Sequence, residues 1–207
     1  MSLPFYNCYT HQKIFFGLLS LIVLLTIGNS LQAQTQEFDP NYYYQQSLNI
    51  QRSGMHVLGG WALLNIVSGV YGNYKFSQES KYFFQMNAAW NMVNLGIAGI
   101  GLYGVANSSL DIQEIEMFSE MSKFDRILLI NAGLDLIYIG VGSTILKKGL
   151  KKNSSRMIGY GRSIILQGGF LLLFDLGLYM LHSNNTEVLF QLTERLQLTY
   201  SGIRVNF

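Results

Sequence analysis

The sequence predicts an all-α membrane protein, built as a bundle of four transmembrane helices. The chain has 207 residues, of which 49% are hydrophobic and only 13% charged, about half the charged share of an ordinary soluble domain. It also contains four long stretches with almost no charge, and a helix needs about 20 apolar residues to cross a bilayer. Something other than water is therefore expected to surround part of this protein.

Residues 1–33 are predicted to be a signal peptide. Lys13 precedes an almost entirely apolar run, Ile14 to Ile27, and Ala33 offers a small residue for cleavage. The only cysteine, Cys8, lies in this segment, so the mature chain would form neither a disulfide nor a thiolate metal site. If the segment is retained, it becomes an additional anchoring helix and leaves the remaining topology unchanged.

A polar, tyrosine-rich segment follows at residues 34–51, and residues 52–183 are predicted to form the four-helix transmembrane domain. The charge-poor stretches are Gly54 to Tyr74, Tyr82 to Leu110, Ile127 to Leu146 and Ser163 to Thr186, and their only charged residues are Asp135 and Asp175. Inside lipid the backbone polar groups must pair within each segment, which makes these stretches helices.

Residues 184–207 are predicted to be a surface segment. Asn184 and Glu187 resemble a capping box, which starts a helix. Val188, Leu189, Leu192 and Leu196 would give that helix one apolar face. The pattern predicts a short amphipathic helix that lies on the membrane surface.

The distribution of basic residues predicts the orientation. With the mature N-terminus outside, eight basic residues lie on the inner side and five on the outer side. The inner ones are Lys75, Lys81, Lys147, Lys148, Lys151, Lys152, Arg156 and Arg162, and the outer ones are Arg52, Lys123, Arg126, Arg195 and Arg204. Lys and Arg are retained in the cytoplasm, which favours a bacterial inner-membrane protein with both mature termini in the periplasm. The basic loop Lys147 to Arg156 is expected to contact anionic lipid.

Each predicted helix carries polar residues near mid-membrane depth, and these form the candidate site. The cluster comprises Asn65, Asn94, Asn131, Asp135 and Asp175. Trp61 and Trp90 each precede an asparagine by four residues, which places both tryptophans on the same helical faces, inside the bundle. Similar spacing in Arg52 to Asn65 and Arg162 to Asp175 suggests duplication of a helical hairpin, with chance resemblance as the alternative.

Two interpretations of the cluster remain open. Ionisable residues within a membrane are candidates for proton or cation sites, and two neighbouring carboxyls would share a proton or a cation because both cannot remain charged. Alternatively, protonated Asp and the Asn amides hold the helices together by hydrogen bonds. The absence of proline from the two Asp-bearing stretches favours packing over a transporter with broken helices.

Other chemistry finds little support in the sequence. Gly99-Ile-Gly101-Leu-Tyr-Gly104 matches a dinucleotide fingerprint by letters, but that motif requires a preceding strand. His11, His56 and His182 lack metal-ligand spacing, and no serine, cysteine or histidine arrangement indicates a nucleophile. The net charge of +2 gives no reason to expect nucleic acid. We expect no enzymatic activity, no cofactor and no metal.

The segment GMHVLGGWALLNIVSG, the LQAQ that ends the predicted signal peptide and the four-helix layout resemble an uncharacterised membrane-protein family of Bacteroidota type, over about residues 45 to 185. The resemblance implies no activity and no functional residues. The sequence therefore predicts a non-enzymatic structural or interaction component. Its expected partners are the bilayer and either another membrane protein or a second copy of the chain. The alternative is a small proton- or cation-linked transporter that uses Asp135 and Asp175.

Overall fold

A computed structural model describes residues 39–200, with side-chain surroundings described as far as Gln191. Four helices make up this region: α2 (Pro40–Lys75), α3 (Gln78–Ala106), α4 (Glu114–Lys151) and α5 (Ser155–Tyr200). The predicted all-α class and the predicted helical bundle are confirmed. The predicted signal peptide, residues 1–33, lies outside the described residues.

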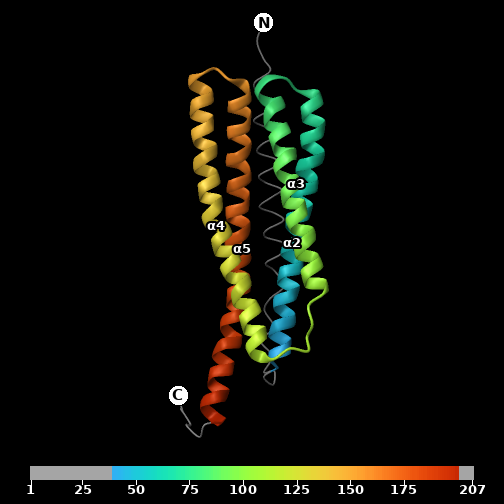
Figure 1. The fold of residues 1–207 in the computed structure, drawn as a ribbon, viewed down its shortest axis with the longest axis vertical. Helices are drawn as coiled ribbons and strands as arrows, with labels where there is room; N and C mark the ends of the chain where they lie inside the picture. The colour runs from blue at the N-terminus through green and yellow to red at the C-terminus, as the bar shows by residue number, and fades with distance from the viewer. Residues whose placement is uncertain (1–38, 201–207) are drawn as a thin grey trace. The chain divides into compact units, whose positions relative to one another are not determined.

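The four helices form two antiparallel hairpins, α2–α3 and α4–α5 (Figure 1). The short turns of both hairpins lie at the same end of the bundle, which we call the turn end. The longer α3–α4 connection lies at the opposite end, which we call the loop end. Helices α2 and α5 each contact all three other helices.

Helix α2 begins earlier than the sequence analysis proposed. Asp39 caps it by accepting a hydrogen bond from the Asn41 N–H at 2.9 Å, and Pro40 occupies the first helical position. An acidic N-cap followed by proline is a favoured helix start, because the side chain satisfies a free backbone donor and the proline ring presets φ. Most of the predicted polar segment, residues 34–51, is therefore the first part of α2.

The turn between α4 and α5 shows why the hairpin reverses at that point. Asn153 has a φ of 49°, in the left-handed region that asparagine tolerates better than most residues. The Ser154 N–H donates to the Gly149 carbonyl at 2.9 Å, and the Asn153 N–H donates to the Leu150 carbonyl at 3.4 Å. This pair of bonds is a Schellman motif, which satisfies the last carbonyls of α4 and ends the helix.

At the loop end, the helices build a small apolar core of their own. Its buried members are Tyr44, Leu48, Val105, Met117, Met121 and Leu189. They come from α2, α3, α4 and α5, so this core ties all four helices together beyond the charge-poor stretches. We call this part of the bundle the loop-end layer.

The prediction of a separate short C-terminal helix that begins at Asn184 is wrong. Helix α5 continues without interruption from Ser155 to Tyr200, a length of 46 residues. Its continuation is held by packing in the loop-end layer, where Leu189 is 2% exposed and Asn185 Nδ2 donates to the Tyr43 carbonyl at 2.7 Å. Leu189 therefore faces the other helices, whereas the sequence pattern had placed it on a membrane surface.

Two of the four helices are long and apolar enough to cross a membrane. These are α4 and the Ser155–Gln191 part of α5, within the residues that the structure describes. No 18-residue stretch of α2 or α3 is as apolar as those of α4 and α5, although both helices are long enough.

Candidate functional site

Asn87 lies at the centre of a hydrogen-bond network that joins three helices. Its side-chain oxygen accepts hydrogen bonds from Gln167 Nε2 at 2.5 Å and from Ser163 Oγ at 3.2 Å, both on α5. Its side-chain nitrogen donates to Asn65 Oδ1 on α2. All four side chains are at most 3% exposed. Because each buried amide finds a partner on another helix, the network fixes the register of α2, α3 and α5.

Trp61 extends this network on α2. Its indole Nε1–H donates to Gln167 Oε1 at 3.0 Å, and its ring stacks on Phe170 with a centroid separation of 3.8 Å. Asn65 Nδ2 donates to the Trp61 carbonyl at 2.8 Å. Trp90, on α3, is only half-buried, and its ring lies perpendicular to the Tyr138 ring with centroids 4.9 Å apart. The two tryptophans therefore have different surroundings.

The asparagines of α3 form a ladder along one face of that helix. Asn91 Nδ2 donates to the Asn87 carbonyl at 2.8 Å, and Asn94 Nδ2 donates to Asn91 Oδ1 at 3.3 Å. Asn94 is 3% exposed. The steps of four and three residues keep the three side chains on the buried face.

Asp135 on α4 and Asp175 on α5 are close enough to interact with each other. Their side chains are 3% and 5% exposed. Asn131, one helical turn before Asp135, is only partly buried.

The amide network and the carboxyl pair lie at different heights in the bundle. Asn65 and Asn87 are ten and nine residues from the turn-end limits of their helices, Lys75 and Gln78, which is about 15 Å at the usual helical rise. Asp175 is 20 residues beyond Ser155, the start of α5, or about 30 Å. Asn94 and Asp135 lie between these heights, because each is 16 residues from the turn-end limit of its helix, or about 24 Å. The polar residues singled out by the sequence are therefore spread along the bundle.

A third group of polar side chains lies still closer to the loop end. His182 Nδ1 is 2.7 Å from Asp125 Oδ1, and His182 Nε2 is 2.5 Å from Ser47 Oγ. Gln51 Nε2 also donates to Ser47 Oγ, at 3.2 Å. The carboxylate accepts the Nδ1–H of the imidazole, which leaves Nε2 to accept the serine hydroxyl. This chain links α2, α4 and α5 through their side chains.

The same three residue types form the catalytic triad of many hydrolases, so their accessibility matters here. Ser47 and His182 are both 0% exposed. Ser47 also lies within α2, where the neighbouring backbone N–H groups bond within the helix and do not form an oxyanion hole. In this conformation the three side chains therefore link α2, α4 and α5 by hydrogen bonds.

The sequence analysis did not anticipate this group, nor the roles of Gln167 and Ser163. One signal was present. The polar residues of α5 follow one another at steps of four, eight and seven residues, which keeps them on the broad face that carries Gly168 and Leu178. They are Ser163, Gln167, Asp175 and His182. Ser47 and Asp125 had no such signal, because the segments that contain them were treated as a polar connection and as a loop.

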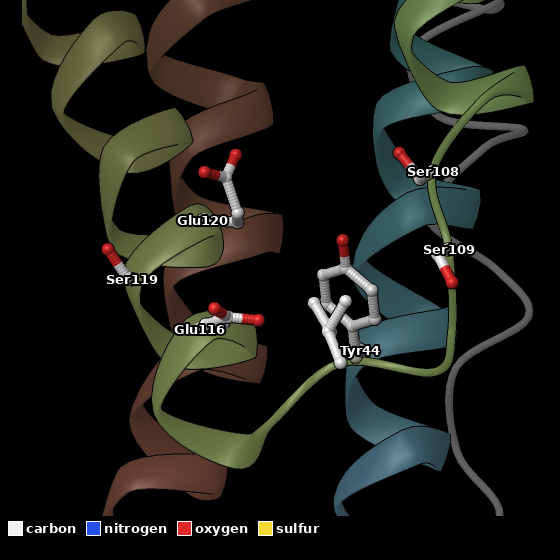
Figure 2. A pocket seen from close by; sticks show the side chains of 7 residues that line it. Tyr44, Ser108, Ser109, Glu116, Ser119 and Glu120 are labelled. Carbon is white, nitrogen blue, oxygen red and sulfur yellow. The ribbon is translucent and has the colours of Figure 1, made fainter.

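An open cavity of about 370 Å³ lies at the loop end, between α2, the start of α4 and the α3–α4 connection (Figure 2). It is lined by Tyr44, Ser108, Ser109, Ile112, Glu116, Ser119 and Glu120. Burial raises the pKa of the Tyr44 phenol; a hydrogen bond with Ser108 lowers it in part, and the nearby Glu120 charge raises it further. The cavity is polar and acidic.

The five basic residues Lys147, Lys148, Lys151, Lys152 and Arg156 are all exposed at the turn end. Lys147, Lys148 and Lys151 belong to the last turns of α4, and Arg156 to the first turn of α5. The Arg156 guanidinium lies 5.3 Å from the centre of the Tyr160 ring. Within residues 39–200, no group of three or more His, Cys, Asp or Glu side chains could hold a metal ion.

Comparison with known proteins identifies a family but no activity. The model of a family of unknown function, DUF6992, matches residues 57–176, and the chain belongs to that family. No curated protein and no solved structure matches the chain. The matched region contains the amide network and the carboxyl pair, and it ends before His182.

Proposed function

We propose that this member of the DUF6992 family is an integral protein of the bacterial inner membrane, in which all four helices cross the bilayer. In this proposal it acts as a structural or interaction component and not as an enzyme. The observation that carries the proposal is the apolar outer surface of every helix. Leu64 on α2, Ile100 on α3, Ile130 on α4 and Leu173 on α5 are 61%, 75%, 64% and 71% exposed. They belong to a larger set of exposed, large apolar side chains that is spread along all four helices, and soluble proteins rarely expose contiguous apolar surface of such extent.

The less apolar stretches of α2 and α3 are compatible with this proposal. The residues that reduce their mean hydropathy include Asn65, Asn87, Asn91 and Asn94, and all four are buried between helices. Lipid would contact only the outward residues of these helices, most of which are apolar. An average over all residues of a stretch therefore underestimates the hydrophobicity of the surface that a membrane would meet.

The positions of the charged residues support four spans of similar depth. On α2 the charge-free stretch runs from Arg52 to Lys75, and on α5 only Asp175 interrupts the stretch from Arg162 to Glu187. Each stretch corresponds to about 35–38 Å of helix, which is long enough for a hydrocarbon core about 30 Å thick. At the turn end, Arg162 of α5 pairs with Glu79 of α3 at 2.8 Å. This ion pair marks where the proposed membrane span ends on both helices.

We place the turn end in the cytoplasm and the loop end in the periplasm. The turn end carries the exposed basic residues of the α4–α5 hairpin, among them Lys147, Lys148, Lys151 and Lys152. The α3–α4 connection and the start of α4 are acidic, with Asp111, Glu114 and Glu116. Positive residues in short loops favour the cytoplasmic side. Both mature termini are then periplasmic.

The interior polar residues favour a packing role. The Asn87 network satisfies its amides by bonds across helices, as in other membrane bundles where polar side chains hold helices together. The buried Ser47 hydroxyl offers a substrate no access. The natural partners in this proposal are the bilayer and either another membrane protein or a second copy of the chain.

Labelling of single cysteines tests the four-span topology. In a Cys8→Ser background, the variants Ser77→Cys, Asn153→Cys and Ser109→Cys place one thiol in each connection. A membrane-impermeant maleimide applied to cells should modify only Ser109→Cys, and the other two should react after the membrane is opened. If only α4 and α5 crossed the membrane, Ser77→Cys would react from outside as Ser109→Cys does. Leu64→Cys, predicted to face lipid, is the unreactive control.

One observation favours the second candidate, a proton- or cation-linked transporter. Asp135 Oδ2 is buried and has no hydrogen-bond partner among the residues that the structure describes. A bound cation would stabilise the folded form by mass action. Thermal stability should then depend on Na⁺ or K⁺, and Asp135→Asn and Asp175→Asn should abolish that dependence. Asp111→Asn, at an exposed position, is the matched control. A wild-type stability that does not change with either ion contradicts cation binding.

A further inference from the structure

Two pairs of ionisable side chains lie one above the other along the contact between α4 and α5. The first is Asp135 with Asp175, and the second is Asp125 with His182. The pairs are ten residues apart on α4 and seven on α5, which corresponds to about 15 Å and 10 Å. Both helices therefore present a buried column of proton-carrying groups that leads from the loop end towards the interior.

The inner pair contains an unsatisfied acceptor. Asp135 is only 3% exposed, and its Oδ2 atom has no hydrogen-bond partner within the described part of the chain. An unpaired buried carboxylate oxygen costs free energy, because it has lost water without gaining a donor. A proton that moves between the two carboxyls, or on and off the pair, would satisfy it.

The outer pair is suited to exchange protons with the aqueous side. His182 is completely buried, whereas the Asp125 side chain is 13% exposed. Asp125 therefore connects the imidazole to the surface of the loop-end layer. Histidine is the side chain whose charge changes most readily near neutral pH, and Asp and His chains serve as proton relays in membrane pumps.

Apolar residues close the space between the two pairs. Leu128 on α4 is 2% exposed and Leu178 on α5 is 6% exposed, and each lies between the two ionisable residues of its helix. Leu178 occupies the space that Gly54 leaves open, since a Cβ atom at Gly54 would lie 2.7 Å from Leu178 Cδ2. The two leucines separate the inner pair from the outer one in this conformation.

Few other charges act on this column. The spans of α2 and α3 contain no Asp, Glu, Lys or Arg, and His56 on α2 is exposed. On α4 the nearest charged side chains are Lys123 and Arg126, and on α5 it is Glu187; all three are exposed. The inner pair is therefore influenced mainly by its own two carboxyls.

We propose that Asp135 and Asp175 form an exchangeable proton site, that Asp125 and His182 are its entry from the loop end, and that Leu128 and Leu178 are the barrier between them. The inference rests on the proposed membrane topology and deepens its transporter alternative by naming the proton as the ligand. His182 already holds a proton on Nδ1, facing Asp125, so a proton taken up from water binds at Nε2 and gives an imidazolium that the Asp125 carboxylate stabilises. Nε2 then releases that proton, a carboxylate oxygen of the inner pair accepts it, and the imidazole is neutral again. No bond other than those to the proton changes.

Infrared spectroscopy of the full chain in lipid vesicles tests this proposal. A protonated carboxyl gives a C=O band that shifts when H₂O is replaced by D₂O, and the time course of the shift reports proton exchange. We expect such a band in the wild type, a shifted band in each of the single variants Asp135→Asn and Asp175→Asn, and loss of the band in the double variant; asparagine keeps the size of the side chain. Absence of the band in the wild type overturns the proton site.

The exchange rate tests the route. Leu178→Ala should speed the shift several-fold by opening the barrier, and His182→Gln and Asp125→Asn should slow it. Leu173→Ala, on the exposed face of α5, is the matched control and should leave the rate unchanged. Equal rates in the wild type, Leu178→Ala and both entry variants overturn the route. Cysteine labelling of the same preparations reports the topology separately, so a failed proton site is distinguishable from a failed membrane span.

Discussion

Trp61 lies flat against Phe170, with ring centroids 3.8 Å apart and ring planes 6° from parallel. The same indole donates its N–H to Gln167, 106 residues later in the chain. One side chain of α2 therefore makes both an aromatic and a polar contact with α5. These contacts connect the two hairpins at the level of the amide network.

Replacement of Trp61 by alanine should destabilise the protein much more than the same change at Trp90. Trp61 is 5% exposed, and loss of a buried aromatic side chain costs about 3–5 kcal/mol when the site cannot collapse. Trp90 is half-buried, so part of its side chain already lacks protein contacts. Reversible unfolding in detergent measures both. Equal losses would contradict the different burial of the two rings.

Gly161→Ala should weaken the α4–α5 contact, whereas Gly169→Ala on the same helix should be tolerated. A Cβ at Gly161 would lie 2.6 Å from the Leu146 backbone N, while a Cβ at Gly169 meets nothing within 4 Å. Overpacking against backbone costs about 1–3 kcal/mol, and alanine in an open helical position gains up to about 1 kcal/mol over glycine. The melting temperatures should therefore move in opposite directions. A stable Gly161→Ala variant would show that α4 and α5 pack less closely.

Stability should decline at alkaline pH, in part through Tyr44. Burial raises the pKa of Tyr44 above its ordinary value of 10.0, so the folded chain keeps this proton to a higher pH than the unfolded chain. The stabilisation is fully present below the ordinary pKa and is lost as pH rises through the raised one. Tyr44→Phe, which has no proton to lose, should flatten the alkaline decline. Tyr42→Phe, at an exposed ring, is the control, and identical pH profiles for Tyr44→Phe and the wild type would refute the effect.

A fluorophosphonate probe should not modify Ser47 in the folded protein. The hydroxyl contacts His182 and is 0% exposed, so the probe cannot reach it although the neighbouring groups resemble a hydrolytic triad. Mass spectrometry of peptides from the treated protein detects the adduct. Ser163, also 0% exposed but hydrogen-bonded to Asn87, is the matched reference. An adduct on Ser47 that disappears in His182→Gln would contradict the non-enzymatic proposal.

Local patterns in the sequence were sufficient for the helical class and for most of the buried faces, although Trp90 and Asn131 are only partly buried. Asn65, Asn94, Asp135 and Asp175 were placed on interior faces by steps of three and four residues, and all are buried. The hydrogen-bond partner of each residue could not be predicted in the same way. Helical spacing gives the direction of a side chain on its own helix, but the choice of Gln167 by Asn87 depends on how two helices are aligned.

The loop end was the least predictable region for the same physical reason. Asn184 carries a capping signal, but it lies within α5 because Leu189 and Asn185 bind to α2 and the loop-end core. Tertiary contacts of this kind outweigh a local cap preference of about 1 kcal/mol. Ser47, Asp125 and His182 come from segments far apart in the chain, so their meeting followed only from the fold.

The length of α5 has a mechanical consequence. It is one uninterrupted helix of 46 residues, so it extends for about 70 Å from the α4–α5 turn to Tyr200. In the proposed topology such a rod acts as a lever. A small tilt or rotation imposed on the part beyond His182, for example by a periplasmic partner, would be transmitted to Asp175, Gln167 and the cytoplasmic turn.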